Sequence, residues 1–157
     1  MAMSAEHVFS VLTRLDRHGI DCLLFGGWAE EALRLATPRS HRDIDLLLPA
    51  SSFSSLDKLL QSQAAEFSEI RLKRFAHKRA FLCDGGMVEI ILVQESEQSA
   101  VTNFWGDNPF HWKLPLEEEC YLAKRRLRAA SRENLAFYRQ HHALTQPGRW
   151  KDPASLL

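Results

Sequence analysis

The sequence lacks several features that mark specialised classes of protein. It has three cysteines in 157 residues, none of them in a CxxC pair, so one must stay unpaired. This usage favours buried free thiols in a reducing cytoplasm over a disulfide framework. The formal net charge is +0, so the chain has no bulk attraction to nucleic acid or to an anionic membrane surface. It has no apolar run long enough to span a bilayer and no signal-peptide core at its start. We therefore predict a cytoplasmic protein without a membrane partner.

The pattern of apolar residues predicts one α/β domain of the α+β type over residues 1–157, with a small mixed sheet flanked by helices. About four or five strands are expected, and strand-like segments occur at 21–25, 42–49, 67–74, 80–83 and 87–93, with a hairpin turn at 84–86. Helical patterns occur at about 8–17, at 28–36, after Ser51 or Ser52, and from Ser131 to about His142. Residues 94–120 show no regular pattern and are expected to be irregular.

The segment SHRDIDLLLP, residues 40–49, places two carboxylates at the start of a buried strand. Residues two apart in a strand project on the same side, so Asp43 and Asp45 should lie together. Like charges this close raise one another's pKa unless a cation lies between them, and Mg²⁺ prefers such hard oxygen ligands. The alternative is a solvated strand end at which Arg39 or Arg42 pairs with the carboxylates.

A third acid, Glu89, interrupts the apolar segment MVEIILV at residues 87–93. Burying a carboxylate there is costly unless it is paired or bound to metal, and the alternative is an edge strand that faces water. On a strand next to the first two acids, Glu89 would complete a shared metal site. We therefore predict that the carboxylates of Asp43, Asp45 and Glu89 face one cleft.

The segment LLFGGWAEEALRLATPRSHRDIDLLL resembles the nucleotidyltransferase signature of the polymerase-β-like superfamily. That signature has a glycine turn after a strand, then two aspartates around one apolar residue, and a third acid in a later strand. The variant in this sequence is similar to the lincosamide and aminoglycoside nucleotidyltransferases: Gly26-Gly27-Trp28-Ala29, then Arg39, His41 and Asp43-Ile44-Asp45-Leu46. The family turn often reads Gly-Ser, and the Gly-Gly found here leaves only backbone donors for a phosphate.

The resemblance implies a Mg²⁺-dependent enzyme that moves a nucleoside monophosphate to a hydroxyl of a small-molecule acceptor, such as an antibiotic. The co-substrate would be ATP or another nucleoside triphosphate. Asp43, Asp45 and Glu89 would be the catalytic residues and the ligands of two Mg²⁺ ions. Glu89 could also act as the base toward the acceptor hydroxyl.

The same resemblance implies a nucleotide-binding set. Gly26 and Gly27 would let the backbone approach the phosphates at a helix start. Arg39 and His41 would assist the departing pyrophosphate, and the alternative is that they are solvated charges of a loop. The acceptor cleft would be open on one side, which a homodimer could complete. The competing functions are nucleotidyl transfer to protein or RNA, as in toxin-like relatives, and a catalytically silent nucleotide-binding module. The neutral net charge disfavours nucleic acid.

Three weaker patterns leave alternatives open. Lys78 or Arg79 could reach a phosphate, and so could the basic run at 123–128, although solvated surface charges are the more usual case. Trp105 and Trp112 could stack on a base or on a ring-shaped acceptor. They could equally fill a small core beneath a long loop, which is the interpretation we favour.

Overall fold

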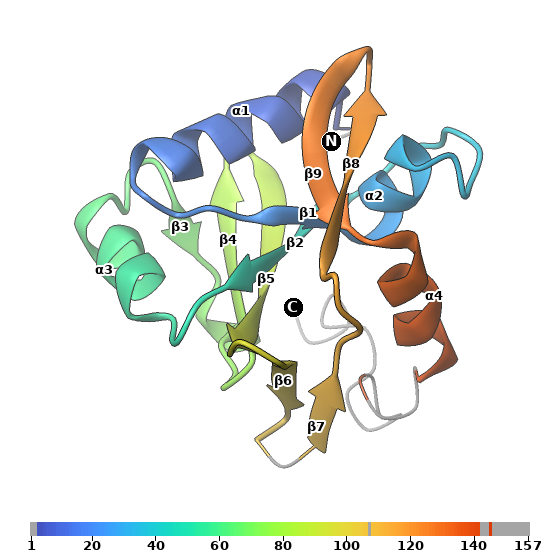
Figure 1. The fold of residues 1–157 in the computed structure, drawn as a ribbon. Coiled ribbons are helices and arrows are strands. Elements are labelled where there is room, and N and C mark those ends of the chain that lie inside the picture. The colour runs from blue at the N-terminus through green and yellow to red at the C-terminus, as the bar shows by residue number, and fades with distance from the viewer. Residues whose placement is uncertain (1–2, 107, 142–144, 146–157) are drawn as a thin grey trace.

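The computed structural model describes residues 3–106, 108–141 and 145 and has a large mixed sheet with helices packed on it (Figure 1). The helices are α1 (Ala5–Arg17), α2 (Gly26–Ala32), α3 (Ser54–Ser62) and α4 (Arg132–Gln140), with a short 3₁₀ turn, η1 (Arg71–Lys73). The strands are β1 (Leu23–Phe25), β2 (Asp43–Pro49), β3 (Ser68–Glu69), β4 (Lys78–Cys83), β5 (Gly86–Glu95), β6 (Ala100–Phe104), β7 (Asn108–His111), β8 (Glu117–Leu122) and β9 (Arg125–Ala130). The fold class is the predicted one.

The main path of the sheet runs β3-β4-β5-β2-β1-β9-β8, with the β6–β7 hairpin attached to the far end of β5. At its centre, β2 pairs with β5 in parallel and with β1 in antiparallel orientation. These central strands are strongly apolar, as expected for strands covered on both faces. β1 also pairs in parallel with β9, which joins the first and last strands of the described chain.

The helices lie where their apolar stripes can be buried. Ser4 caps α1 by accepting a hydrogen bond from the backbone N–H of His7, and the helix buries a stripe that includes Val8, Val11 and Leu15. In Figure 1, α1 crosses the sheet, α3 lies beside β3, and α2 and α4 lie together near β8 and β9. Within the described residues, every helix is too short or too polar to cross a lipid bilayer.

Several predicted elements are confirmed. The 84–86 turn joins β4 to β5 through Asp84 and Gly85, both with positive φ, as a two-residue hairpin requires. Ser131 caps α4 by accepting from the backbone N–H of Asn134. The helix ends at Gln140, and the predicted end at His142 lies outside the described residues.

The prediction of an irregular segment over 94–120 is wrong. This stretch contains β6, β7 and most of β8, and the described part of the chain forms a sheet of nine strands where four or five were expected. Two features interrupt the alternation of apolar and polar residues that marks a strand pair. One is Pro109, and the other is the turn at Trp105 and Gly106, where both of these turn residues have positive φ. Trp112 is buried among Phe25 and Phe110, which confirms the core interpretation for that side chain.

The predicted strand over 67–74 is also wrong in its second half. Only Ser68 and Glu69 pair with β4, and the chain then turns through η1. The turn directs Lys73 into the interior, where it is 2% exposed. This change of direction brings a second lysine to the acidic residues described below.

Candidate active site

The register of the central strands brings the three predicted acids to one face of the sheet. Asp43 and Asp45 are two apart on β2, so both project on the same side. Asp45 is directly paired with Glu89 on the parallel neighbour β5. Paired residues on adjacent strands share a face, and each of the three residues offers an oxygen that lies within 4.8 Å of the others. The predicted convergence of the three carboxylates is confirmed.

The carboxylates line a cavity of about 350 Å³. Its wall is completed by Gly26 and Phe25 from the β1–α2 junction, Glu30 from α2, Lys78 and Ile91 from the sheet, and Leu135, Tyr138 and Arg139 from α4. The cavity thus has an acidic floor on the sheet and a partly apolar wall on the helices. Arg139 donates a hydrogen bond to Glu30 Oε1 at 2.5 Å across the cavity rim.

Two lysines hold the Glu89 carboxylate, one at each oxygen. Lys73 Nζ lies 2.6 Å from Oε1 and 3.2 Å from the Met87 sulfur. Lys78 Nζ lies 2.8 Å from Oε2. Both lysines are buried, so these charge-assisted contacts are largely shielded from water.

Burial raises the pKa of Asp45 well above its usual value, and the charges of Asp43 and Glu89 add to this rise. The pKa of Asp43 is also raised, first by burial and then by Glu89. Lys73 and Lys78 oppose both shifts but do not cancel them. The two aspartates therefore lie in a site where ionisation is less favourable than in water, and a further positive charge would make it more favourable.

Burial also acts to raise the pKa of Glu89, but Lys78 and Lys73 outweigh it and the net pKa is lowered. The three carboxylates are thus unequal. Glu89 already has its positive partners, whereas Asp43 and Asp45 form no ion pair with Arg39 or Arg42 within the described residues. A divalent cation bound by oxygen would meet this deficit, so the residues present fit Mg²⁺.

Gly26 is required by the position of Asp45. Its φ is +62°, and a Cβ there would lie 2.3 Å from Asp45 Oδ2. Any side chain at this position would displace the carboxylate from the cavity. The neighbours of Gly27 are different side chains, since a Cβ there would lie 2.6 Å from Arg39 Nη2 and 2.9 Å from His41 Nδ1.

Arg39 and His41 lie beside Gly27 but do not line the cavity. His41 is buried, its Nε2 lies 3.0 Å from Glu31 Oε1, and its ring is 4.2 Å from that of Trp28. Arg39 is exposed. The structure therefore places Gly26 with the three acids, and Gly27 with Arg39 and His41 in an adjacent group.

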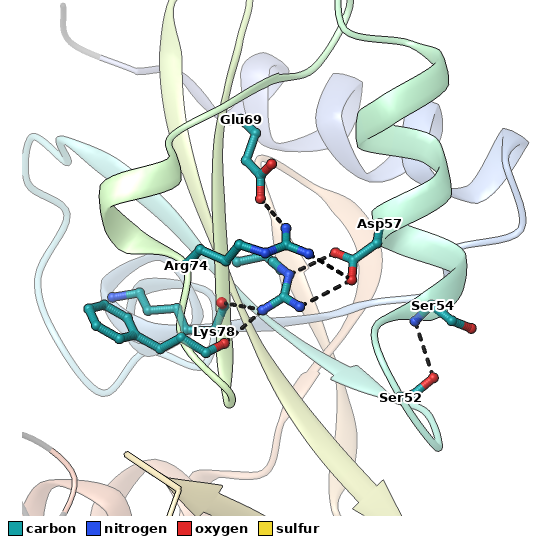
Figure 2. Close-up of polar contacts among 8 residues, drawn as sticks. Ser52, Ser54, Asp57, Glu69, Arg74 and Lys78 are labelled. Carbon is teal, nitrogen blue, oxygen red and sulfur yellow. Dashed lines mark hydrogen bonds and ion pairs between the residues drawn. The ribbon is translucent and has the colours of Figure 1, made fainter.

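Strand alternation separates Lys78 from Arg79. Lys78 pairs with Ile91 of β5, on the face of Glu89, whereas Arg79 projects to the other face. There Arg79 binds both oxygens of Asp57 at 2.7 and 3.1 Å. Figure 2 shows Asp57 also contacting Arg74, which in turn contacts Glu69. Of the two candidates for a phosphate contact, only Lys78 reaches the cavity.

The basic run at 123–128 forms the β8–β9 turn and much of β9. Its arginines face acidic partners, as Arg128 contacts Asp21 and Glu117 and Arg126 contacts Glu119. This fits surface charge pairing. The sequence reasoning missed Lys73, Glu30 and Arg139, because no local pattern links a lysine after β3 or residues on α2 and α4 to the acids.

The sequence profile of the aminoglycoside-2''-adenylyltransferase family matches residues 7–148. No curated protein matches the sequence. The profile spans the glycine turn, the two aspartates, Glu89 and α4, and so covers every residue that lines the cavity.

Solved structures with the same fold include antibiotic-modifying enzymes. The lincosamide antibiotic adenylyltransferase LnuA, solved with lincomycin, has a TM-score of 0.73 and 16% identity, over 96% of this chain and 94% of that chain. ANT(2'')-Ia, solved with adenylyl-2''-tobramycin, has a TM-score of 0.65 and 15% identity, over 95% and 81%. A putative nucleotidyltransferase from Thermotoga maritima has a TM-score of 0.52 and 17% identity, over 98% and 92%. At such low identity the structural matches establish the fold.

Proposed function

The chain belongs to the aminoglycoside-2''-adenylyltransferase family and is a nucleotidyltransferase, and from this premise we propose that it transfers AMP from ATP to a hydroxyl of a small-molecule antibiotic. The observation that carries the proposal is the convergence of Asp43, Asp45 and Glu89 within 4.8 Å at the floor of a cavity. Lys73 and Lys78 do not offset the repulsion at Asp43 and Asp45, so a divalent cation would be favoured there, and a triphosphate arrives with one.

In this proposal Asp43, Asp45 and Glu89 are the ligands of two Mg²⁺ ions. When bound, such ions would offset the negative charge that develops during an in-line phosphoryl displacement. The protein's own contribution is to fix the ligands on rigid neighbouring strands, so that they keep their positions during the reaction. Gly26 contributes by leaving room for the Asp45 carboxylate.

Glu89 serves first as a ligand and second as the group that receives the acceptor's proton. Its lowered pKa keeps it ionised at neutral pH but makes it a weak base. Both of its oxygens are engaged by lysines, so one must be freed before it can accept a hydrogen bond from an acceptor hydroxyl.

The phosphates are assigned to the glycine turn and its neighbours. The Cβ position of Gly26 faces Asp45 and that of Gly27 faces Arg39 and His41, so a triphosphate extending from the acids along the turn would meet the Arg39 guanidinium and the His41 ring. His41 is oriented by Glu31, and the exposed Arg39 is free to move toward the leaving pyrophosphate.

The acceptor is assigned to the wall formed by α2 and α4. Phe25 and Tyr138, with ring centroids 4.9 Å apart, offer apolar surface for a sugar or a ring system, and Glu30 offers a carboxylate for an amine. The structural neighbours were solved with lincomycin and with adenylyl-2''-tobramycin, which supports an antibiotic acceptor and an adenylyl donor. The buried free cysteines support a cytoplasmic setting, and a homodimer would close the open side of the cavity.

The test is a screen of aminoglycosides and lincosamides with each of the four nucleoside triphosphates and Mg²⁺, read by the mass of the acceptor. We expect an acceptor heavier by one AMP, only with ATP and only with the wild-type protein, with Asp45→Asn as the inactive control. Labelling of protein or RNA in place of the small molecules would support the toxin-like alternative. Nucleotide binding without Mg²⁺, and without modification of any molecule offered, would support the catalytically silent nucleotide-binding module.

A further inference from the structure

The two lysines on Glu89 differ in what surrounds them. Lys73 lies on η1 behind the carboxylate, is 2% exposed, and contacts the Met87 sulfur as well as Glu89 Oε1. Lys78 lies at the start of β4 and lines the cavity with the three acids. One ammonium group is therefore enclosed by protein, and the other stands where a ligand would enter.

We infer that Lys78 is a nucleotide-binding residue that exchanges partners, contacting Glu89 in the free protein and the triphosphate in the loaded one, while Lys73 stays on Glu89. This inference rests on the proposed function. It divides the lysines into a positioning residue, Lys73, and a residue that touches the substrate, Lys78.

Competition between positive charges is the first argument. Lys78 Nζ contacts Glu89 Oε2, and an oxygen of this same carboxylate lies within 4.8 Å of oxygens of Asp43 and Asp45, where a dication would bind. A dication sharing that carboxylate would repel the ammonium group, since like charges in a buried site interact strongly. Lys78 must then find another negative partner.

The triphosphate would supply the negative partner that the Lys78 ammonium group then needs. Lysine carries a compact charge on a flexible four-carbon stem, so it can swing while its backbone stays paired in the sheet. The backbone of Lys78 is fixed on both sides: its N–H donates to the Phe75 carbonyl, and its own carbonyl accepts from Arg79 Nη1 at 3.0 Å. Only the side chain needs to move, and it already lines the cavity.

The exchange would also free Glu89. When Lys78 leaves, Oε2 becomes available to a metal ion or to an acceptor hydroxyl, while Lys73 keeps Oε1 and the orientation of the carboxylate. Nucleotide binding would thereby prepare the group proposed to receive the acceptor's proton. The order of events is then fixed, with the nucleotide entering before Glu89 can act.

The first experiment is calorimetric titration of Lys78→Gln with Mg²⁺ alone and with a non-hydrolysable ATP analogue plus Mg²⁺. Mg²⁺ alone should bind several-fold tighter than to the wild type, because a competing cation is gone. The analogue should bind roughly tenfold weaker or more, because a charge-assisted contact is lost. Lys58→Gln, which removes an exposed lysine on α3, is the matched control and should shift neither value.

A second measurement needs no variant. In the wild-type protein, labelling of lysine amines read by mass spectrometry should show Lys78 more reactive with Mg²⁺ alone and protected with Mg²⁺ and the analogue, and Lys73 unreactive throughout. Unchanged Lys78 reactivity, or two affinities that move together in Lys78→Gln, would overturn the exchange. Wild-type protein that binds no Mg²⁺–nucleotide would overturn the proposed function as well, so the two failures are distinguishable.

Discussion

Asp45 and Glu89 lie directly opposite each other on the parallel strands β2 and β5, yet their surroundings shift their pKa values in opposite directions. Burial acts on both in the same sense. At Glu89 the contacts with Lys78 and Lys73 outweigh burial, whereas at Asp45 the same two lysines do not outweigh burial and the like charges of Asp43 and Glu89. The site is therefore least stable at Asp45, which is where an added cation would relieve the most repulsion.

Asp45→Asn should abolish nucleotidyl transfer and at the same time stabilise the metal-free protein. The substitution removes a carboxyl group whose ionisation is opposed in the folded state by burial and by Asp43 and Glu89, and we expect a gain on the order of 1 kcal/mol in the free energy of unfolding at neutral pH. Urea denaturation in EDTA measures it. A clear loss of stability in the metal-free variant would mean that Asp45 has a structural partner.

The same variant should lose a pH dependence. In the unfolded chain Asp45 ionises near 3.8, and in the folded protein only at a higher pH. Between these values the folded state binds more protons than the unfolded state, so wild-type stability falls as the pH rises through this window. The advantage of Asp45→Asn should therefore grow from about pH 4 upward. An advantage that is constant with pH would contradict the raised pKa.

Gly26→Ala should weaken both folding and Mg²⁺ binding. Its Cβ would collide with Asp45 Oδ2, and its φ of +62° adds about 1 kcal/mol of backbone strain. Gly106→Ala is the matched control, because Gly106 also has positive φ but nothing within 4 Å of the added Cβ. The Mg²⁺ affinity of the control should be unchanged, and an equal loss in both variants would remove the link to Asp45.

Gly27→Val should weaken nucleotide binding far more than folding. The added side chain would meet the flexible end of Arg39 and the ring of His41, so both assigned phosphate contacts would move. Calorimetry with ATP analogue and Mg²⁺, beside a denaturation curve, separates the two effects. Unchanged affinity in a folded variant would exclude the glycine turn from the phosphate site.

His77 should make the protein sensitive to mild acid. Burial lowers its pKa from 6.5 to about 4, and its Nδ1 accepts a hydrogen bond from the backbone N–H of Trp105 at 3.2 Å, which requires the neutral ring. Between pH 6.5 and pH 4, His77 binds a proton in the unfolded state but stays neutral in the folded state. Stability should therefore fall by up to about 3 kcal/mol between pH 6.5 and pH 4. His77→Gln should show a shallower fall, and the exposed His111→Gln should match the wild type.

The ion-pair cluster on the opposite face of β4 should contribute to stability through Arg79. Arg79 donates hydrogen bonds to both oxygens of Asp57 and to the Phe75 carbonyl, the last at 2.7 Å. Asp57→Asn should cost about 1–3 kcal/mol in urea denaturation, because it leaves a mostly buried guanidinium short of a charged partner. Arg74→Gln, at the exposed end of the cluster, should cost less than about 1 kcal/mol. Equal losses would mean that burial does not set the difference.

The acidic residues of the site could be predicted because each rests on a local rule. Alternation on β2 places Asp43 beside Asp45, and a carboxylate within the apolar β5 demands a partner. The hairpin at Asp84 and Gly85 was likewise visible in its turn residues. Such patterns depend only on neighbouring residues in the sequence, so they can be recognised without knowledge of the whole fold.

The parts that could not be predicted depend on tertiary contacts. Lys73 faces inward because η1 reverses the chain after only two residues of β3, and no propensity marks that turn. β6 and β7 hold together through Phe104, Phe110 and Trp112, whose packing outweighs a proline within the strand. Residues on α4 reach the cavity only because β9 returns beside β1.

The parallel pairing of β1 with β9 has a consequence for synthesis of the protein. Leu24 pairs with Ala129, so the strand that completes the sheet beside β1 is made about a hundred residues later. Until then, the nascent chain presents the unpaired, wholly apolar edge of Leu23–Phe25. Ribosome-bound chains in which β9 has not yet emerged from the exit tunnel should therefore depend on chaperones and aggregate readily, whereas chains in which β9 has emerged should not.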